Sequence, residues 1–127
     1  MASCDSLLVY NRNGGGALAF PMTGGHVIGA GTLYHLSAHW ADITATDDSV
    51  LFLNAPVGAW GRLVGGQFTQ TGHSNSFSAS YPVGTSDSVL FYSTSGTSGI
   101  ATLKGGTYHY VGSQSGFAVW QVISGAK

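Results

Sequence analysis

The side chains that could carry acid–base or metal chemistry in this chain are few and scattered. The 127 residues include five aspartates, no glutamate, five histidines and a single cysteine, Cys4. His35 and His39 stand four residues apart, but the sequence around them is strand-like rather than helical, so the two rings need not share a face. The sequence contains no HExxH motif and no Cys/His cluster with the spacing of zinc ligands. We therefore predict a protein without catalytic activity, metal or cofactor.

Recognition of a neutral, hydroxyl-rich ligand matches this composition better. A sugar needs hydrogen-bonding side chains such as Asp, Asn, Gln, His and Ser, and an aromatic plane on which its apolar C–H face can stack. The chain has three Trp, six Tyr and six Phe, whereas only 7% of its residues are charged and the net charge is −1. Nucleic acid and anionic membrane surfaces attract clustered Lys and Arg, so this charge argues against both. We expect glycans or glycoconjugates as partners.

The elements that would position these side chains are set by an internal repeat. Three markers recur in the same order with a period of about 40 residues: an Asp-Ser-(Leu/Val)-Leu phrase, a Gly-Gly pair and a large aromatic residue. We therefore divide a single domain, 1–127, into repeats 5–47, 48–86 and 87–127. The markers are Asp5–Leu8, Gly24–Gly25 and Trp40, then Asp48–Leu51, Gly65–Gly66 and Tyr81, then Asp87–Leu90, Gly105–Gly106 and Trp120.

Each repeat is predicted to form four short strands, because apolar runs alternate with turn residues and no helical stripe is present. The Gly-Gly pair ends the second strand of each repeat, where a positive φ is useful. The fold class is therefore all-β. The predicted first strands are 7–10, 50–53 and 89–92, the second strands 17–20, 59–64 and 100–103, a third strand 107–111, and the fourth strands 77–81 and 117–120.

Two closures fit three such units, since a four-stranded unit of this size cannot bury its apolar face alone. The first is a β-trefoil, in which three four-stranded repeats complete one barrel within a single chain. The second is a set of three β-propeller blades, which would complete a ring by oligomerisation because propellers need at least four blades. We favour the trefoil because it is self-contained, and keep the propeller as the alternative.

The repeat openings Asp5–Tyr10 and Asp87–Tyr92 resemble blade openings of VCBS/FG-GAP-type propeller repeats, as do the pairings of Trp40 with Ile43 and of Trp120 with Ile123. The Asp-x-Asp-x-Asp-Gly calcium loops of many such blades are absent. Three-unit β proteins with these features are also similar to lectins of the trefoil or propeller kind, although the Gln-x-Trp motif of ricin-type trefoils is absent. The resemblance implies a non-catalytic carbohydrate-binding lectin with repeated shallow sites, which would bind multivalently.

Candidate ligand contacts are the aromatic residues and the polar residues of the loops. Trp40, Tyr81 and Trp120 recur, which suits either core packing or sugar stacking. Trp60 stands where the other repeats have Ala17 and Gly99, and it is a candidate for an exposed stacking residue. The repeated aspartates are predicted to bond nearby backbone N–H groups in turns. The full candidate set is Trp40, Trp60, Tyr81, Trp120, Asn11, Asn54, His35, His39, Asp42, His73, Asn75 and Gln114.

Two other functions stay open: a protein-binding module such as a trefoil-type protease inhibitor, and a structural subunit that assembles with copies of itself into a homo-oligomer. The single cysteine cannot form an internal disulfide. Residues 1–5 lack the basic and long apolar segments of a secretory signal, and no run of 18 apolar residues predicts membrane insertion. A cytoplasmic location and secretion without a leader are both compatible with the sequence.

Overall fold

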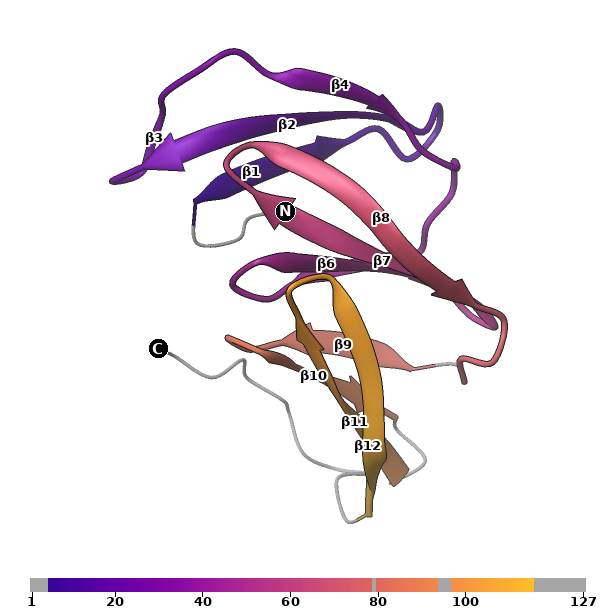
Figure 1. The fold of residues 1–127 in the computed structure, drawn as a ribbon. Coiled ribbons are helices and arrows are strands. Elements are labelled where there is room, and N and C mark those ends of the chain that lie inside the picture. Colours follow the sequence, from indigo (N-terminus) through magenta and orange to yellow (C-terminus); the bar gives the residue numbers. More distant parts are fainter. Residues whose placement is uncertain (1–4, 79, 94–96, 116–127) are drawn as a thin grey trace.

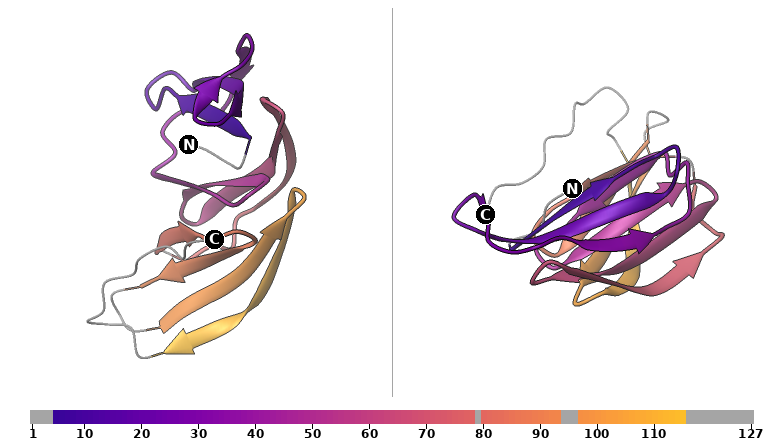
Figure 2. Two further views of the ribbon diagram at one scale, coloured as in Figure 1. Left: turned by 90° about the vertical axis from the view of Figure 1, so that its left-hand side faces the viewer. Right: turned by 90° about the horizontal axis from the view of Figure 1, so that it is seen from above.

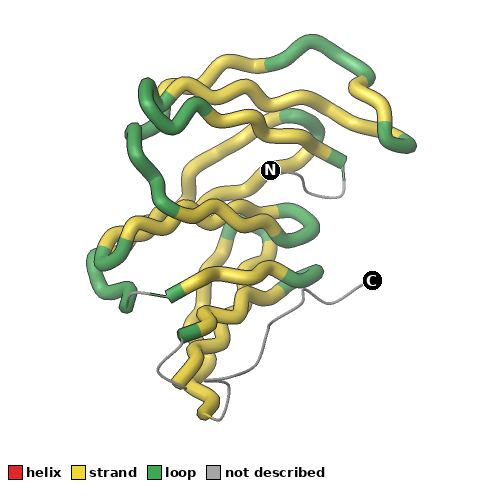
Figure 3. The backbone as a smooth tube through the Cα atoms, turned by 180° about the vertical axis from the view of Figure 1, so that it is seen from behind, coloured by secondary structure: helices red, strands yellow, loops and turns green. Residues whose placement is uncertain are grey.

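The computed structural model describes residues 5–78, 80–93 and 97–115, and this part of the chain consists of strands and loops without a helix (Figure 3). It therefore contains no helix that is long and apolar enough to cross a membrane. The all-β prediction is confirmed. The strands are β1 (Ser6–Tyr10), β2 (Gly16–Thr23), β3 (His26–Val27), β4 (Thr32–His35), β5 (Asp42–Ala45), β6 (Ser49–Asn54), β7 (Val57–Val64), β8 (Gln67–Ser74), β9 (Tyr81–Gly84), β10 (Ser88–Tyr92), β11 (Thr97–Lys104) and β12 (Thr107–Ser115).

These strands form three antiparallel four-stranded sheets that follow one another along the molecule (Figures 1 and 2). Sheet 1 has the order β1-β2-β3, with β4 also beside β2; sheet 2 is β5-β6-β7-β8; sheet 3 is β12-β11-β10-β9. Within the described residues, each strand pairs only inside its own sheet, so the sheets lie as separate layers and close no common barrel. The prediction of three four-stranded units is confirmed at this level.

One hairpin in each sheet is built on a Gly-Gly pair: β2 to β3 in sheet 1, β7 to β8 in sheet 2 and β11 to β12 in sheet 3. Gly24 and Gly25 have φ of 56° and 80°, and the pairs at 65–66 and 105–106 have nearly the same values. A two-residue turn with both φ values positive matches the right-handed twist of the strands it joins, and glycine adopts it without strain. The predicted end of the second strand at each Gly-Gly pair is confirmed.

Strand register shows which residues of the three sheets occupy equivalent positions. Trp60 pairs with Leu51, as Ala19 pairs with Leu8 and Ile100 with Leu90. The equivalents of Trp60 are therefore Ala19 and Ile100, and the assignment to Ala17 and Gly99 was wrong by two positions in sheet 1 and one in sheet 3. The sequence comparison erred because the first turn, between β1 and β2, differs in length among the sheets.

The predicted fourth strand at 77–81 was also wrong in its position. Strand β9 begins only at Tyr81, and Phe77 lies before it outside any strand. The Phe77 N–H donates to the Pro56 carbonyl at 3.0 Å, and its ring packs 5.7 Å from that of Phe91, so the residue is held by loop contacts instead of a ladder. The other predicted fourth strand, 117–120, lies outside the described residues.

The last strand of each of the first two repeats is the first strand of the next sheet. Strand β5, inside the first sequence repeat, pairs with β6 of the second, and β9 pairs with β10 in the same way. Sheets 2 and 3 therefore each contain strands of two successive repeats, whereas sheet 1 is formed within the first repeat.

Two apolar cores hold the three sheets together, one at each boundary between neighbouring sheets. Strand β6 contributes to both, because five of its six residues are buried. Its Val50 and Phe52 pack toward sheet 1, whereas Leu51 and Leu53 pack toward sheet 3. Alternate side chains of a strand point to opposite faces, so one strand can serve two cores.

A polar contact, which we call the Asp-Ser clasp, recurs at both boundaries. At the first, the Gly65 N–H donates to the Asp5 carboxylate at 3.1 Å and the Gly66 N–H donates to the Ser6 hydroxyl at 2.9 Å. At the second, Asp48 accepts from Gly105 at 2.9 and 3.0 Å, and Ser49 accepts from Gly106 at 2.9 Å. The predicted bond of these aspartates to nearby N–H groups is thus wrong about the partner, which is the Gly-Gly turn of the following sheet.

Candidate functional site

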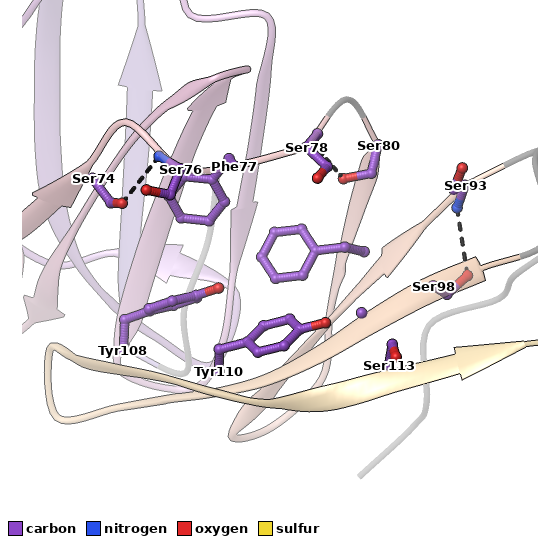
Figure 4. Close-up of a pocket in the computed structure, with 12 residues that line it drawn as sticks. Ser74, Ser76, Phe77, Ser78, Ser80, Ser93, Ser98, Tyr108, Tyr110 and Ser113 are labelled. Atoms are coloured by element: carbon purple, nitrogen blue, oxygen red, sulfur yellow. Dashed lines mark hydrogen bonds between the residues drawn. The ribbon is translucent and has the colours of Figure 1, made fainter.

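The main candidate site is a cavity of about 660 Å³ where sheets 2 and 3 meet (Figure 4). We call it the serine pocket, because seven serines surround it. Its walls come from the end of β8, the segment between β8 and β9, strand β10 with the residue after it, and strands β11 and β12. The lining residues are Ser74, Ser76, Phe77, Ser78, Ser80, Phe91, Ser93, Ser98, Gly99, Tyr108, Tyr110 and Ser113.

The aromatic side of the serine pocket belongs to the core between the two sheets. The rings of Phe77 and Tyr108 lie 5.5 Å apart, and Phe91 is 5.7 Å from Phe77 and 6.3 Å from Tyr108. Such tilted and edge-on arrangements are favourable for aromatic quadrupoles. The three rings therefore fix one another and form a rigid apolar wall.

Tyr110, which like Tyr108 lies on β12, completes this wall and is 51% exposed. Its ring lies against Gly99, where a Cβ atom would stand only 2.9 Å from Tyr110 Cε1. In Figure 4 the Tyr108 and Tyr110 rings lie side by side, with both hydroxyls toward the space between the serine-bearing segments. The absence of a side chain at Gly99 thus lets the accessible tyrosine ring lie down along the pocket.

Hydroxyl groups on three different segments form the rim of the serine pocket. Ser76 N–H donates to the Ser74 hydroxyl at 3.2 Å, and the Ser80 hydroxyl donates to the Ser78 carbonyl at the same distance. The Ser98 hydroxyl, which is buried, accepts from the Ser93 N–H at 3.4 Å. These local bonds orient the serines. The Ser80 hydroxyl keeps acceptor capacity toward a ligand, and the Ser98 hydroxyl, which accepts locally, keeps its own proton to donate.

The serine pocket is electrically neutral over its described lining. These residues include no Asp, His, Lys, Arg or Cys. Burial, together with the neighbouring Tyr110, raises the pKa of Tyr108 from 10.0 to about 12. The Tyr108 phenol therefore keeps its proton at any physiological pH. The lining residues offer hydroxyl dipoles and aromatic faces, but no pair of nucleophile and general base.

A second, smaller cavity of about 310 Å³ lies at the equivalent place between sheets 1 and 2. We call it the histidine pocket, since His35 and His73 line it together with Trp40. Strand register relates five of its lining residues to residues of the serine pocket: Phe52 to Phe91, Ala59 to Gly99, Phe68 to Tyr108, Gln70 to Tyr110 and His73 to Ser113. The two cavities are therefore one recurring site with different linings.

The histidine pocket brings together three of the twelve predicted contacts, His35, Trp40 and His73. Trp40 is half-buried, and its ring lies 5.8 Å from that of Phe52. Phe77 packs on Phe91 at 5.7 Å in the same manner, so the structural counterpart of Trp40 is Phe77 and not Tyr81.

Trp60 lies behind the serine pocket without lining it. Its ring is half-buried, 4.8 Å from that of Tyr108 and 6.3 Å from that of Phe77. It therefore supports two rings of the aromatic wall from sheet 2.

Seven of the predicted contacts line neither cavity, and the side chain of Gln114 and the whole of Trp120 lie outside the described part of the chain. Asn11 forms a turn, because its carboxamide oxygen accepts from the N–H groups of Asn13 and Gly14 at 3.0 and 3.3 Å. Tyr81 is 60% exposed and pairs with Tyr92 across β9 and β10. Among the remaining contacts, His39, Asn54 and Asn75 are exposed, whereas Trp60 and Asp42 are half-buried. The backbone of Gln114 pairs with that of Ser98.

The serines of the pocket were missed in the sequence. Ser74, Ser76, Ser78 and Ser80 follow one another at every second position, a pattern that places hydroxyls on one side of an extended segment. This alternation was the available signal. No cluster of three or more His, Cys, Asp or Glu side chains suited to a metal occurs among the described residues.

Comparison with protein-family models, with curated proteins and with solved structures finds no match to this chain.

Proposed function

We propose that this chain is a non-catalytic carbohydrate-binding protein, a lectin, and that it binds neutral sugars in the serine pocket. The observation that carries the proposal is the lining of that pocket, which has seven serine hydroxyls and two phenols around an aromatic wall and no charged side chain among its described residues. Neutral sugars present hydroxyls and apolar C–H faces, so both halves of this lining have a partner on the ligand.

The dimensions of the serine pocket suit a small ligand. Ligand sites usually enclose about 300–1,000 Å³, and the cavity of about 660 Å³ lies in the middle of that range. Tyr110 supplies the accessible ring for stacking, because half of its side chain is exposed. Tyr108 supplies a phenol that stays neutral and can donate or accept a hydrogen bond.

The histidine pocket is a second and narrower site of the same kind. It keeps an aromatic wall in Trp40, Phe52 and Phe68, and its polar lining consists of His35, Ser37, Gln70 and His73. Amide and imidazole groups also bond sugar hydroxyls, so two sites per chain would bind a branched glycan or a glycan-coated surface with avidity.

For the closure of the fold we propose propeller blades instead of a trefoil. Each sheet is a separate antiparallel layer, and neighbouring layers pack face to face through the two cores. A trefoil would instead join the three units by strand pairing in one closed barrel, whereas among the described residues no strand pairs with a strand of another sheet. The layered arrangement therefore supports the alternative that the sequence left open.

A glycan array followed by titration calorimetry tests the lectin proposal. The wild-type chain is expected to bind neutral glycans. Tyr110→Ala is expected to lower the affinity for the glycan that binds best on the array about tenfold or more, which is the scale of losing one aromatic–sugar contact. Tyr81→Ala is the matched control, since Tyr81 is a similarly exposed tyrosine outside the pocket. Equal loss in both variants, or no glycan bound on the array, would contradict the proposal. In the second case, inhibition of a protease by the wild-type chain would favour the protein-binding alternative.

A further inference from the structure

We propose that two copies of this chain associate head to tail, with sheet 3 of each copy docking on sheet 1 of the other, to form a closed ring of six sheets. Both ends of the described molecule carry the unoccupied halves of a contact that is complete at its two internal boundaries. The proposal concerns assembly and is independent of whether either pocket binds a sugar.

The Asp-Ser clasp defines one half of that contact. At each internal boundary the serine hydroxyl donates to its neighbouring aspartate, at 2.8 Å for Ser6 and 2.9 Å for Ser49, and both side chains then accept the N–H groups of a Gly-Gly turn. At Asp87 and Ser88 the same internal bond is present at 2.9 Å. The third clasp is therefore already in its binding geometry.

The environment of the third clasp differs from that of the other two. Ser6 and Ser49 are 1% and 0% exposed, whereas Ser88 is half-buried and Asp87 is exposed. Its backbone contact within the sheet is normal, because the Leu103 N–H donates to the Asp87 carbonyl at 2.8 Å as Leu63 does to Asp48. Among the described residues, what distinguishes this clasp is the missing Gly-Gly turn.

The turn that would fill the third clasp exists at the other end of the molecule. Gly24 and Gly25 have the backbone conformation of the two bound turns. Gly66 and Gly106 are buried, and a Cβ there would meet the backbone of Pro21 or stand 3.1 Å from Arg62 Cβ. Gly25 is exposed, and a Cβ there would meet nothing within 4 Å. Sheet 1 thus carries a preformed turn without the sheet that receives such turns elsewhere.

Exposed apolar side chains lie on the same two end sheets as the unpartnered clasp and the unpartnered Gly-Gly turn. On the outer face of sheet 1, Val9, Leu18 and Leu33 lie side by side across three strands, and they are 50%, 39% and 60% exposed. Register makes Phe52 the counterpart of Val9, and Phe52 is 2% exposed because sheet 1 covers it. At the opposite end, Ile100 is 36% exposed where its counterpart Ala19 is fully buried. Exposed apolar clusters of this kind mark interaction surfaces.

A second copy is the occupant that these observations specify. Sheet 1 and sheet 3 of the same chain lie at opposite ends of the stack with sheet 2 between them (Figures 1 and 2), so they do not meet each other. A head-to-tail contact between copies generates either a closed ring or an open filament. Two copies give six sheets, within the four to eight blades of known propellers, and we therefore commit to a closed dimer.

Size-exclusion chromatography with light scattering on the full chain tests this inference. The wild type is expected to elute at twice the 13.0 kDa chain mass. Asp87→Ala, which removes the clasp, and Leu33→Lys, which charges the sheet 1 surface, are each expected to weaken the dimer at least tenfold. Gln67→Lys is the matched control, since it adds the same charge at an exposed position of sheet 2 and should leave the dimer intact. Circular dichroism of each variant establishes that it is folded.

Mixing the two interface variants provides the decisive measurement. In a head-to-tail ring, one of the two interfaces of the mixed dimer unites both altered surfaces, and the other unites two wild-type surfaces. The mixture of Asp87→Ala and Leu33→Lys should therefore form more dimer than either variant alone. A wild-type monomer at every concentration, a series of longer oligomers, or a dimer insensitive to both variants would each overturn the inference.

Discussion

The boundary between sheets 1 and 2 and the boundary between sheets 2 and 3 are built alike but lined differently. Both have an Asp-Ser clasp, a Gly-Gly turn and an apolar core to which β6 contributes side chains. At the first boundary, however, the cavity is lined by imidazole and amide groups, whereas at the second it is lined by serine and tyrosine hydroxyls. The comparison separates residues that join sheets from residues that are free to vary, and the second group determines what each cavity can bind.

The largest effect is expected in the cores that the two boundaries share. Leu8 and Leu51 occupy equivalent positions and are 1% and 0% exposed, whereas their counterpart Leu90 is only half-buried. Truncating a buried leucine to alanine typically costs 2–5 kcal/mol. We expect Leu8→Ala and Leu51→Ala to lower the free energy of unfolding by about 3 kcal/mol each, and Leu90→Ala to cost clearly less. Urea denaturation measures all three, and an equal loss at Leu90 would contradict the equivalence.

The next effect concerns the clasps. Asp5→Ala and Asp48→Ala each remove the acceptor of a Gly-Gly N–H group, and we expect a loss of about 1 kcal/mol in the free energy of unfolding for each. The two losses should agree within error if the boundaries are joined in the same way. Asp42→Ala, which alters an aspartate outside the clasps, is the control in the same urea titrations. A negligible effect at both clasps would mean that the cores alone hold the sheets together.

A smaller effect is expected from making the two linings more alike. Gly99→Ala introduces the residue found at the equivalent Ala59, and its Cβ would press on the Tyr110 ring, which must swing aside. We expect several-fold weaker glycan binding with little change in stability, because Tyr110 is half-exposed and can move. The reverse change, Ala59→Gly, is the control and should leave binding in the serine pocket unaltered. Unchanged affinity in Gly99→Ala would show that the position of Tyr110 does not matter.

The smallest effect is a dependence of stability on alkaline pH that arises at the second boundary. The pKa of Tyr108 rises from 10.0 to about 12 in the folded chain, mainly through burial. Folding thus favours the protonated phenol, so this contribution to stability is complete below pH 10 and is lost as the pH rises toward 12. The equivalent Phe68 carries no such group. Tyr108→Phe should remove this part of the alkaline decline, as measured by urea denaturation between those pH values, and an unchanged decline would contradict the assignment.

The sequence predicted those parts of the fold that depend on short-range patterns. Alternating apolar runs located the first and second strands, and Gly-Gly pairs located the turns, because a positive φ at two successive residues is a local requirement. Short-range patterns could not predict which residues bind the Asp-Ser phrase, since Gly65 is 60 residues from Asp5. The regular spacing of the two markers was nevertheless an indication that they belong together.

The loops resisted prediction for a different reason. An irregular backbone has no periodicity that shows which side chain turns inward, so Tyr81 was equated with Trp40 although Phe77 occupies the corresponding place in the core. The candidate site was found only in part for the same reason. His35, Trp40 and His73 come together, but the serines of the larger cavity depend on how the segment between β8 and β9 is folded.

The position of β6 has a consequence for the order in which the protein loosens. Both of its faces are covered, so neither end sheet can detach without exposing one side of this strand to water. A stack of units that contact only their neighbours opens most easily from its ends. The backbone amides of Val50 to Leu53 should therefore exchange with deuterium later than those of β2 or β11, and their exchange should report the opening of the whole molecule.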